Sequence, residues 1–197
     1  MNKLKITKLS FDGIFVVEPN PFTDSRGIFS RYFCKRELKN IIQDREIVNI
    51  NYSKNYKKGA VRGLHYQKPP CAEMKMPRCI RGKVLDVFVD IRKNSNTFLK
   101  WDSVVLSEEN QKMLIIPEGF AHGIQSLEDN SQILYLSTEH FDSKYEDALN
   151  IKDPHFNITL PMPISDISEK DDKHDFLDLS KLLVKSFAKK NTLCNFR

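Results

Sequence analysis

The chain has 197 residues, of which 40% are hydrophobic and 29% are charged, a composition typical of one globular domain rather than a disordered chain. Its formal net charge of +5 comes from basic residues spread among acidic ones, without a basic stripe interleaved with aromatics, so no nucleic-acid partner is expected. No segment approaches the ~18 apolar residues of a membrane span, and the N-terminus lacks the apolar core of a signal peptide. We therefore expect a cytoplasmic protein without a membrane partner.

The first third of the chain predicts short strands and one short helix. The helix is expected over Lys35–Gln43, because Leu38, Ile41 and Ile42 recur there at helical spacing. The apolar runs on either side predict strands at 14–17, 29–33, 47–51 and 60–65.

Residues 83–91 alternate in a period of two, which favours a strand with two distinct faces. Turn signals then separate further predicted strands at 102–106, 112–116, 123–127 and 132–136. This regular spacing of about ten residues is typical of a sandwich or barrel. In the neighbouring Met76-Pro77 segment, proline lacks a ladder donor, so an edge strand or a bulge is expected.

The C-terminal segment predicts a helix that Asp178 caps and that runs to about Lys189. Its apolar stripe consists of Leu179, Leu182, Leu183 and Phe187. With no internal repeat or linker, we expect one all-β domain over residues 1–197. Its core spans about 5–175 and a helical tail about 176–197.

Two histidines lie in segments that resemble the two motifs of cupin barrels. His65 stands in RGLHYQ and His122 in PEGFAHG, and the strands between them allow both to converge inside a barrel. The second metal histidine of the first motif is replaced by Gln67, and a glutamate follows only at Glu73. Two histidines and a neutral amide make a poor ligand set, so no metal is expected. A metal-dependent cupin enzyme remains the alternative, which elemental analysis would detect.

Without a metal, such a pocket suits proton abstraction. Histidine is the usual general base near neutral pH, and the proton most accessible to it lies on a carbon next to a carbonyl. The developing enolate then needs a cationic or hydrogen-bonding partner. Lys75, ten residues after His65 in a strand-like segment, is the candidate for that charge.

Several segments, in order and spacing, resemble the dTDP-4-dehydrorhamnose 3,5-epimerase family from about residue 5 to 175. They are FTDSRGIF at 22–29, RGLHYQKPP at 62–70, Lys75 with Arg78, DVFVDIRKNSNTF at 86–98, LSEEN at 106–110 and IPEGFAHG at 116–123. The resemblance implies a cupin-type double-stranded β-helix, or jelly roll, that works as a homodimer without cofactor or metal. It also implies inversion of C3 and C5 of a nucleotide-linked 4-keto-6-deoxy sugar.

The resemblance assigns four catalytic positions. His65 would remove the proton, Asp171 would orient and polarise that histidine, and Lys75 would stabilise the enolate. Tyr135 would return a proton on the opposite face of the sugar ring. Positions that the resemblance implies for sugar, diphosphate or nucleotide binding are Arg26, Asn51, Ser53, Arg62, His122, Glu146 and Lys170.

The departures from the family pattern cluster where the nucleotide base is expected. The family usually has glutamine, glutamate and tyrosine where this chain has Asn49, Arg31 and His140. We therefore also count Arg31, Asn49, Gln67 and His140 as candidate substrate-binding residues. Arginine suits guanine O6 and N7, so we favour a GDP-linked hexose or heptose over a dTDP-linked sugar, in surface-polysaccharide biosynthesis such as capsule or lipopolysaccharide.

Three alternatives remain open within and beyond the family. The substrate could be the dTDP-4-dehydro-6-deoxyglucose of the rhamnose pathway, or the enzyme could epimerise C3 alone. A sugar-nucleotide-binding protein without activity is the third alternative, and the presence of all four catalytic matches argues against it. The number of deuterium atoms that the product takes up from D2O would separate C3-only epimerisation from inversion of both carbons, and binding of GDP against dTDP would separate the two nucleotides.

Overall fold

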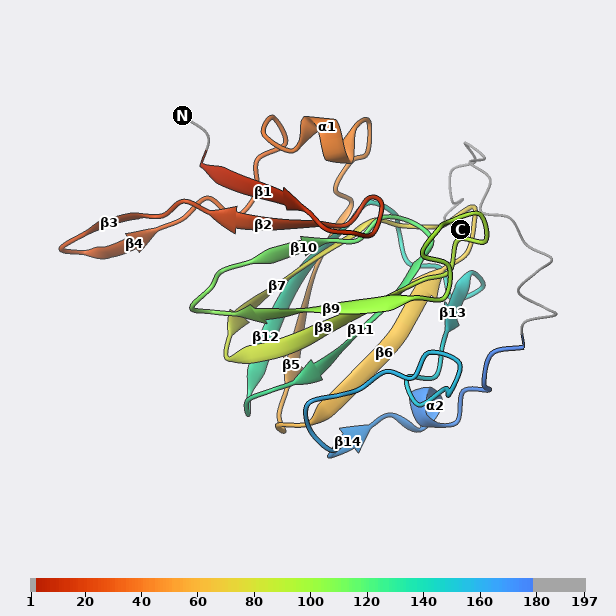
Figure 1. The fold of residues 1–197 in the computed structure, drawn as a ribbon. Coiled ribbons are helices and arrows are strands. Elements are labelled where there is room, and N and C mark those ends of the chain that lie inside the picture. Colours follow the sequence, from red (N-terminus) through yellow and green to blue (C-terminus); the bar gives the residue numbers. More distant parts are fainter. Residues whose placement is uncertain (1–2, 179–197) are drawn as a thin grey trace.

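A computed structural model describes residues 3–178, which form two facing β-sheets with two short helices (Figure 1). The predicted all-β fold is confirmed. The predicted C-terminal helix falls beyond Asp178, outside the described residues. The first sheet has the order β1 (Leu4–Lys8), β2 (Phe15–Pro19), β10 (Met113–Ile115), β7 (Lys75–Arg81), β12 (Ser131–Ser137) and β5 (Asn49–Asn55).

The second sheet packs against the first and carries the longest central strands. Its order is β13 (Glu146–Ala148), β6 (Ala60–Gln67), β11 (Phe120–Ser126), β8 (Lys83–Asp90) and β9 (Trp101–Ser107), with β14 (Asp166–Ile167) paired to β6. All pairings in the two sheets are antiparallel except that of β14 with β6. No helix in residues 3–178 is long and apolar enough to span a membrane.

Strand β8 confirms the two faces that its alternation predicts, but both faces are buried. Val84 and Phe88 belong to the cluster between the two sheets, together with Ile133 of β12. Val87 and Val89 face the other way, into a cluster covered by the chain from Leu149 onward. The alternating acids Asp86 and Asp90 are completely buried, so each needs an internal partner.

The segment between Gly27 and β5 differs from the prediction at two places. Helix α1 is only Lys39–Ile42, because turns occupy residues 35–38 and Gln43 ends the helix at a positive φ of 53°. The predicted strand at 29–33 is wrong beyond Phe29, where the short strand β4 (Gly27–Phe29) ends. The chain after it is held by buried Arg78 of β7, which donates a hydrogen bond to the Tyr32 carbonyl (2.9 Å).

Pro77 does not mark an edge strand or a bulge, so that prediction is wrong. Strand β7 lies between β10 and β12, and Pro77 pairs in register with Tyr135 of β12. On the other side, Lys75 and Ile116 exchange both backbone hydrogen bonds, which directs the Pro77 nitrogen towards β10. Since proline cannot donate there, the ladder between β7 and β10 keeps only the Met113–Arg78 register pair.

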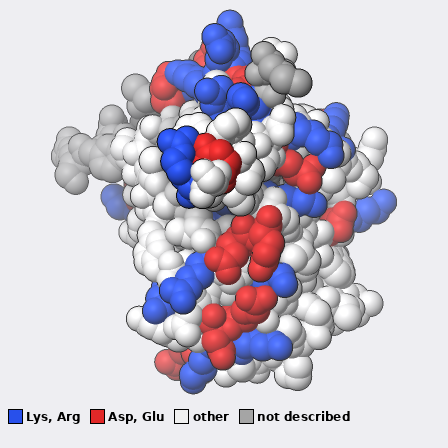
Figure 2. Space-filling model, turned by 90° about the vertical axis from the view of Figure 1, so that its left-hand side faces the viewer, with Lys and Arg blue, Asp and Glu red and all other residues white. Residues whose placement is uncertain are grey.

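A hairpin of β3 (Phe22–Asp24) and β4 extends away from the two sheets (Figure 1). It exposes apolar side chains: Phe22 is 57% exposed, Ile28 63% and Phe29 74%. Figure 2 views the molecule from the hairpin side, and the basic and acidic groups on this face are interspersed. The hairpin is therefore an apolar arm on a surface of mixed charge.

Candidate active site

Both motif histidines point into the space between the sheets. His65 of β6 and His122 of β11 are register partners, and His122 lies on the same face of β11 as Phe120 and Ile124 of the inter-sheet cluster. The two strands approach closely beside them: a Cβ on Gly63 would lie 2.7 Å from the backbone of Gly123. Only glycine permits this approach, so the two glycines of the motifs bring the histidine segments together.

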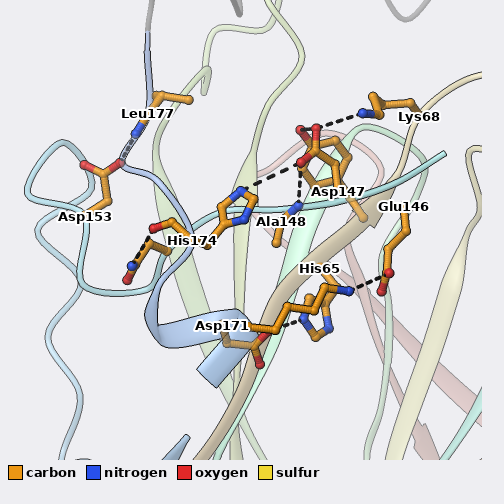
Figure 3. Close-up of polar contacts among 12 residues, drawn as sticks. His65, Lys68, Glu146, Asp147, Ala148, Asp153, Asp171, His174 and Leu177 are labelled. Atoms are coloured by element: carbon orange, nitrogen blue, oxygen red, sulfur yellow. Dashed lines mark hydrogen bonds and ion pairs between the residues drawn. The ribbon is translucent and has the colours of Figure 1, made fainter. Parts of the chain in front are cut away.

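His65 forms an ion-pair contact with Asp171 (Figure 3). Its Nε2 lies 2.7 Å from Asp171 Oδ1, and the other carboxylate oxygen accepts a hydrogen bond from the Gly63 N–H at 3.2 Å. Asp171 lies on the four-residue helix α2 (Glu169–Asp172), which Ser168 caps by accepting the Asp171 N–H. The dyad therefore joins β6 to a segment more than a hundred positions later in the chain.

The electrostatics of the dyad favour an ionised Asp171. Burial by itself raises the pKa of this carboxyl, but the hydrogen bond and charge of His65 and the Gly63 N–H together hold the pKa below its usual value. An anionic carboxylate can only accept hydrogen bonds, so Asp171 favours the His65 tautomer that carries its proton on Nε2. The second ring nitrogen then retains its lone pair, as a general base requires.

Lys75 and Tyr135 come from the opposite sheet. Pro77 pairs with Tyr135 and Lys75 with Ser137, so the two side chains lie on one face of neighbouring strands, the face that also carries Ile133 of the inter-sheet cluster. The Lys75 ammonium lies 3.3 Å from Glu73 Oε1. Burial raises the pKa of the Tyr135 phenol, the charge of Glu73 raises it further, and Arg62 opposes the shift. The phenol is therefore held in its protonated form.

Asp86 is a site residue that the sequence-based list lacks. It is completely buried on β8 and lies 2.9 Å from His122 Nε2, while its Oδ1 has no hydrogen-bond partner within residues 3–178. Burial raises the pKa of its carboxyl, and the positive charges of His122 and Lys75 oppose that rise. An acid at an inward position of an otherwise apolar strand was the signal that could have identified it.

The candidate binding residues on β5 line the same interior. Asn49, Asn51 and Ser53 pair in register with Ser137, Tyr135 and Ile133, which places them on the inward face. Arg62 reaches across from β6 and donates to Asn55 Oδ1 at 2.7 Å. Beside the dyad, Lys170 and Glu146 form an ion pair at 2.6 Å (Figure 3).

Other candidate binding residues are engaged outside the interior. Arg26 binds Asp24 on the hairpin, with a side chain that is 86% exposed, and Arg31 pairs with Glu37 at 2.9 Å.

Gln67 is buried and uses both ends of its amide within the protein. It donates to the carbonyls of Cys71 and His140 and accepts the Asp142 N–H. Gln67 thus positions the segment that carries His140, and its role in substrate binding stays a prediction. Residues 3–178 contain no group of three His, Cys, Asp or Glu side chains arranged to hold a metal ion.

Comparisons with known proteins identify a family for this chain. The family model of dTDP-4-dehydrorhamnose 3,5-epimerase matches residues 8–178. A curated relative of that name from Shigella flexneri is 39% identical over 169 residues, which is 85% of this chain and 93% of the relative. A crystal structure of the Bacillus anthracis epimerase, with TDP and pyrophosphate bound, superposes with a TM-score of 0.85 at 32% identity. It covers 88% of this chain and 99% of that one.

A second solved structure, from Legionella pneumophila in complex with dTDP-4-keto-L-rhamnose, also gives a TM-score of 0.85 at 32% identity. It covers 91% of this chain and 96% of that chain. Fold and relatives together define the class: the chain is a cupin-type isomerase that acts on nucleotide sugars. Within that class, it belongs to the dTDP-4-dehydrorhamnose 3,5-epimerase family.

Proposed function

We propose that the chain inverts C3 and C5 of a dTDP-linked 4-keto-6-deoxy sugar by proton abstraction and return on opposite faces of the ring. The observation that carries the proposal is the arrangement of four side chains between the sheets. The His65–Asp171 pair belongs to the β6 sheet, whereas Lys75 and Tyr135 belong to the facing one. Inversion needs a base and an acid on opposite sides of the substrate.

In the proposed reaction, the free ring nitrogen of His65 takes the proton from the carbon next to the C4 ketone. The electron pair of the broken C–H bond forms a carbon–carbon double bond, and the ketone oxygen becomes an enolate. The Lys75 ammonium stabilises this oxygen, while Asp171 stabilises the imidazolium. Tyr135 then donates its phenol proton to the opposite face of the carbon, and the ketone re-forms. Solvent exchange resets His65 and Tyr135.

The proposed nucleotide is dTDP, and the preference for GDP argued from Arg31 and His140 is not supported. The relative from Shigella flexneri and the family model carry the name of a dTDP sugar, and the solved relatives hold TDP or a dTDP sugar. The physical premise for guanine also weakens, because the Arg31 guanidinium already pairs with Glu37 at 2.9 Å.

We further propose that the working form is a homodimer in which the hairpin of one copy completes the site of the other. Phe22, Ile28 and Phe29 supply exposed apolar area on this arm, and Arg26 lies between its strands, away from its own interior. Sedimentation analysis of the purified chain tests the dimer. Arg26→Ala tests the contribution of the hairpin: we expect weaker substrate binding with unchanged thermal stability.

The activity is tested by incubating the chain with dTDP-4-keto-6-deoxyglucose in D2O, in parallel with a GDP-linked 4-keto sugar. We expect deuterium at C3 and C5 of the dTDP sugar. Label at C3 alone would replace the proposal with C3-only epimerisation, and absence of label at both carbons would contradict it. His65→Asn should abolish the exchange.

A further inference from the structure

Glu73 is an acid in the interior that the proposed mechanism leaves without a role. Its side chain is 10% exposed and contacts the Lys75 ammonium, which is 16% exposed, at 3.3 Å. Met74, between them, points to the outer cluster of the first sheet and is held by its N–H bond to Thr138 Oγ1. Because side chains alternate along an extended chain, Glu73 and Lys75 both turn inward.

Charges act on the Tyr135 phenol from two directions. Glu73 and Lys75 belong to β7 and the chain leading into it, and Arg62 of β6 acts on the phenol from the facing sheet. Strand β5 lies on the other side of β12, and its residue paired with Tyr135 is the uncharged Asn51. Asp86 and His122 form their own pair and act on Lys75. Glu73 is therefore the acid whose charge bears on both Lys75 and Tyr135.

We propose that Glu73 is a positioning residue of this active site, which holds the Lys75 ammonium towards the interior and places its own negative charge on the face of the first sheet that carries Tyr135. The proposal rests on the proposed function and extends it to the proton-return step. A carboxylate beside a phenol opposes formation of a second negative charge, and one beside an ammonium restricts where that ammonium can lie. One side chain thus serves both groups that meet the negative charge of the enolate.

Removing the charge of Glu73 distinguishes a functional role from a purely structural ion pair with Lys75. Glu73→Gln keeps the shape of the side chain and one acceptor oxygen but removes its charge. Loss of a structural contact would lower activity by a similar factor at every pH. Loss of a charge that opposes phenolate formation makes Tyr135 ionise at lower pH, so the alkaline limb of the activity profile moves to lower pH.

The direct test is a spectrophotometric titration of tyrosinate, without substrate. The difference between the chain and its Tyr135→Phe variant isolates Tyr135 from the other five of the six tyrosines. We expect the midpoint for Tyr135 to fall in Glu73→Gln and to stay near its original value in Glu73→Asp, which retains the charge. Glu18→Gln removes a carboxylate that pairs with Lys5 on β1 and is the matched control, for which no shift is expected.

An unchanged Tyr135 midpoint in Glu73→Gln would overturn the proposal, as would a fall of equal size in the control. If the glutamine variant does not fold, Glu73→Asp still decides: a midpoint in that variant as low as that of free tyrosine contradicts the role of the charge. The titration needs no substrate, so it is independent of the proposed function. A shifted midpoint in a chain that exchanges no deuterium supports the coupling and contradicts the epimerase activity.

Discussion

Replacement of Asp171 by asparagine tests the His65–Asp171 pair most directly. The substitution keeps the size of the side chain but removes the charge that faces the imidazole at 2.7 Å, at a position that is only 5% exposed. A hydrogen bond to a charged group contributes about 1.5–3 kcal/mol. At 1.36 kcal/mol per factor of ten, its loss from the transition state lowers the exchange rate roughly 10- to 150-fold.

The asparagine amide adds a second cost. It can donate to His65 Nε2, whereas Asp171 accepts from it, and the ring proton then moves to the nitrogen that should act as base. Such a reversal of tautomer costs about 10⁴-fold in the Ser-His-Asp triad. We therefore expect the loss in Asp171→Asn to lie between roughly 10²- and 10⁴-fold, given both contributions.

The assay is the initial rate of deuterium uptake from D2O into saturating 4-keto sugar. The neighbouring Asp172→Asn is the matched control, because Asp172 lies on the same helix but pairs with Lys152 at 2.5 Å on the surface. Its exchange rate should stay within about threefold of the unmodified chain, since exposed ion pairs contribute ~1 kcal/mol or less. An Asp171→Asn rate as high as that of the control would refute a role for the carboxylate.

Three further predictions follow from the same contacts. Tyr135→Phe should still exchange deuterium at the carbon that His65 deprotonates but form little inverted product, as NMR of the recovered sugar would reveal; normal inversion would remove Tyr135 from the mechanism. Lys75→Gln should lower the exchange rate roughly 10²- to 10³-fold, the usual cost of removing one group that stabilises an oxyanion, and an unchanged rate would assign the enolate to another residue. Asp90→Ala should lower the free energy of unfolding by about 3–5 kcal/mol in urea titrations, because Asp90 is buried and accepts hydrogen bonds from Arg92, Ser95 and Thr97. Burial raises the pKa of the Asp90 carboxyl, but these hydrogen bonds hold that pKa below its usual value. The stabilisation by Asp90 should therefore be full at neutral pH and be lost as the pH falls below about 4.

The strands of the two sheets could be predicted where alternation is supported by turn signals. The predicted strand at 132–136 lies within β12, and the one at 102–106 lies within β9. Prediction failed where long-range contacts override local preference. Arg78 draws the chain after β4 away from strand geometry through Tyr32, a contact between residues 46 positions apart. Proline at position 77 is tolerated in a central strand, because the neighbouring β10 is short and pairs there incompletely.

The resemblance indicated candidate site residues and one contact among them, the His65–Asp171 pair, which the structure shows; the other contacts could not be predicted. The motif resemblance selected His65 and Asp171 together, although no local pattern joins β6 to helix α2. It could not indicate that the Gln67 amide donates a hydrogen bond to the His140 carbonyl, because a glutamine with internal partners and one that binds a ligand look alike in sequence. Nor could it indicate that Arg31 pairs with Glu37, which weakens the premise for guanine recognition.

The two sheets divide the proposed chemistry between them, and this division has a consequence for variants. His65 depends on Asp171, whose segment is secured to the second sheet by the ion pair of Lys170 with Glu146 and by the bonds of Asn150 to the carbonyls of Asp172 and His174. Lys75 and Tyr135 depend instead on Glu73 and the β7–β12 register. Asn150→Ala should therefore slow proton removal, measured as deuterium uptake, and leave the tyrosinate titration of Tyr135 unmoved. A shift in that titration would show that the base and acid sides of the site are not independent.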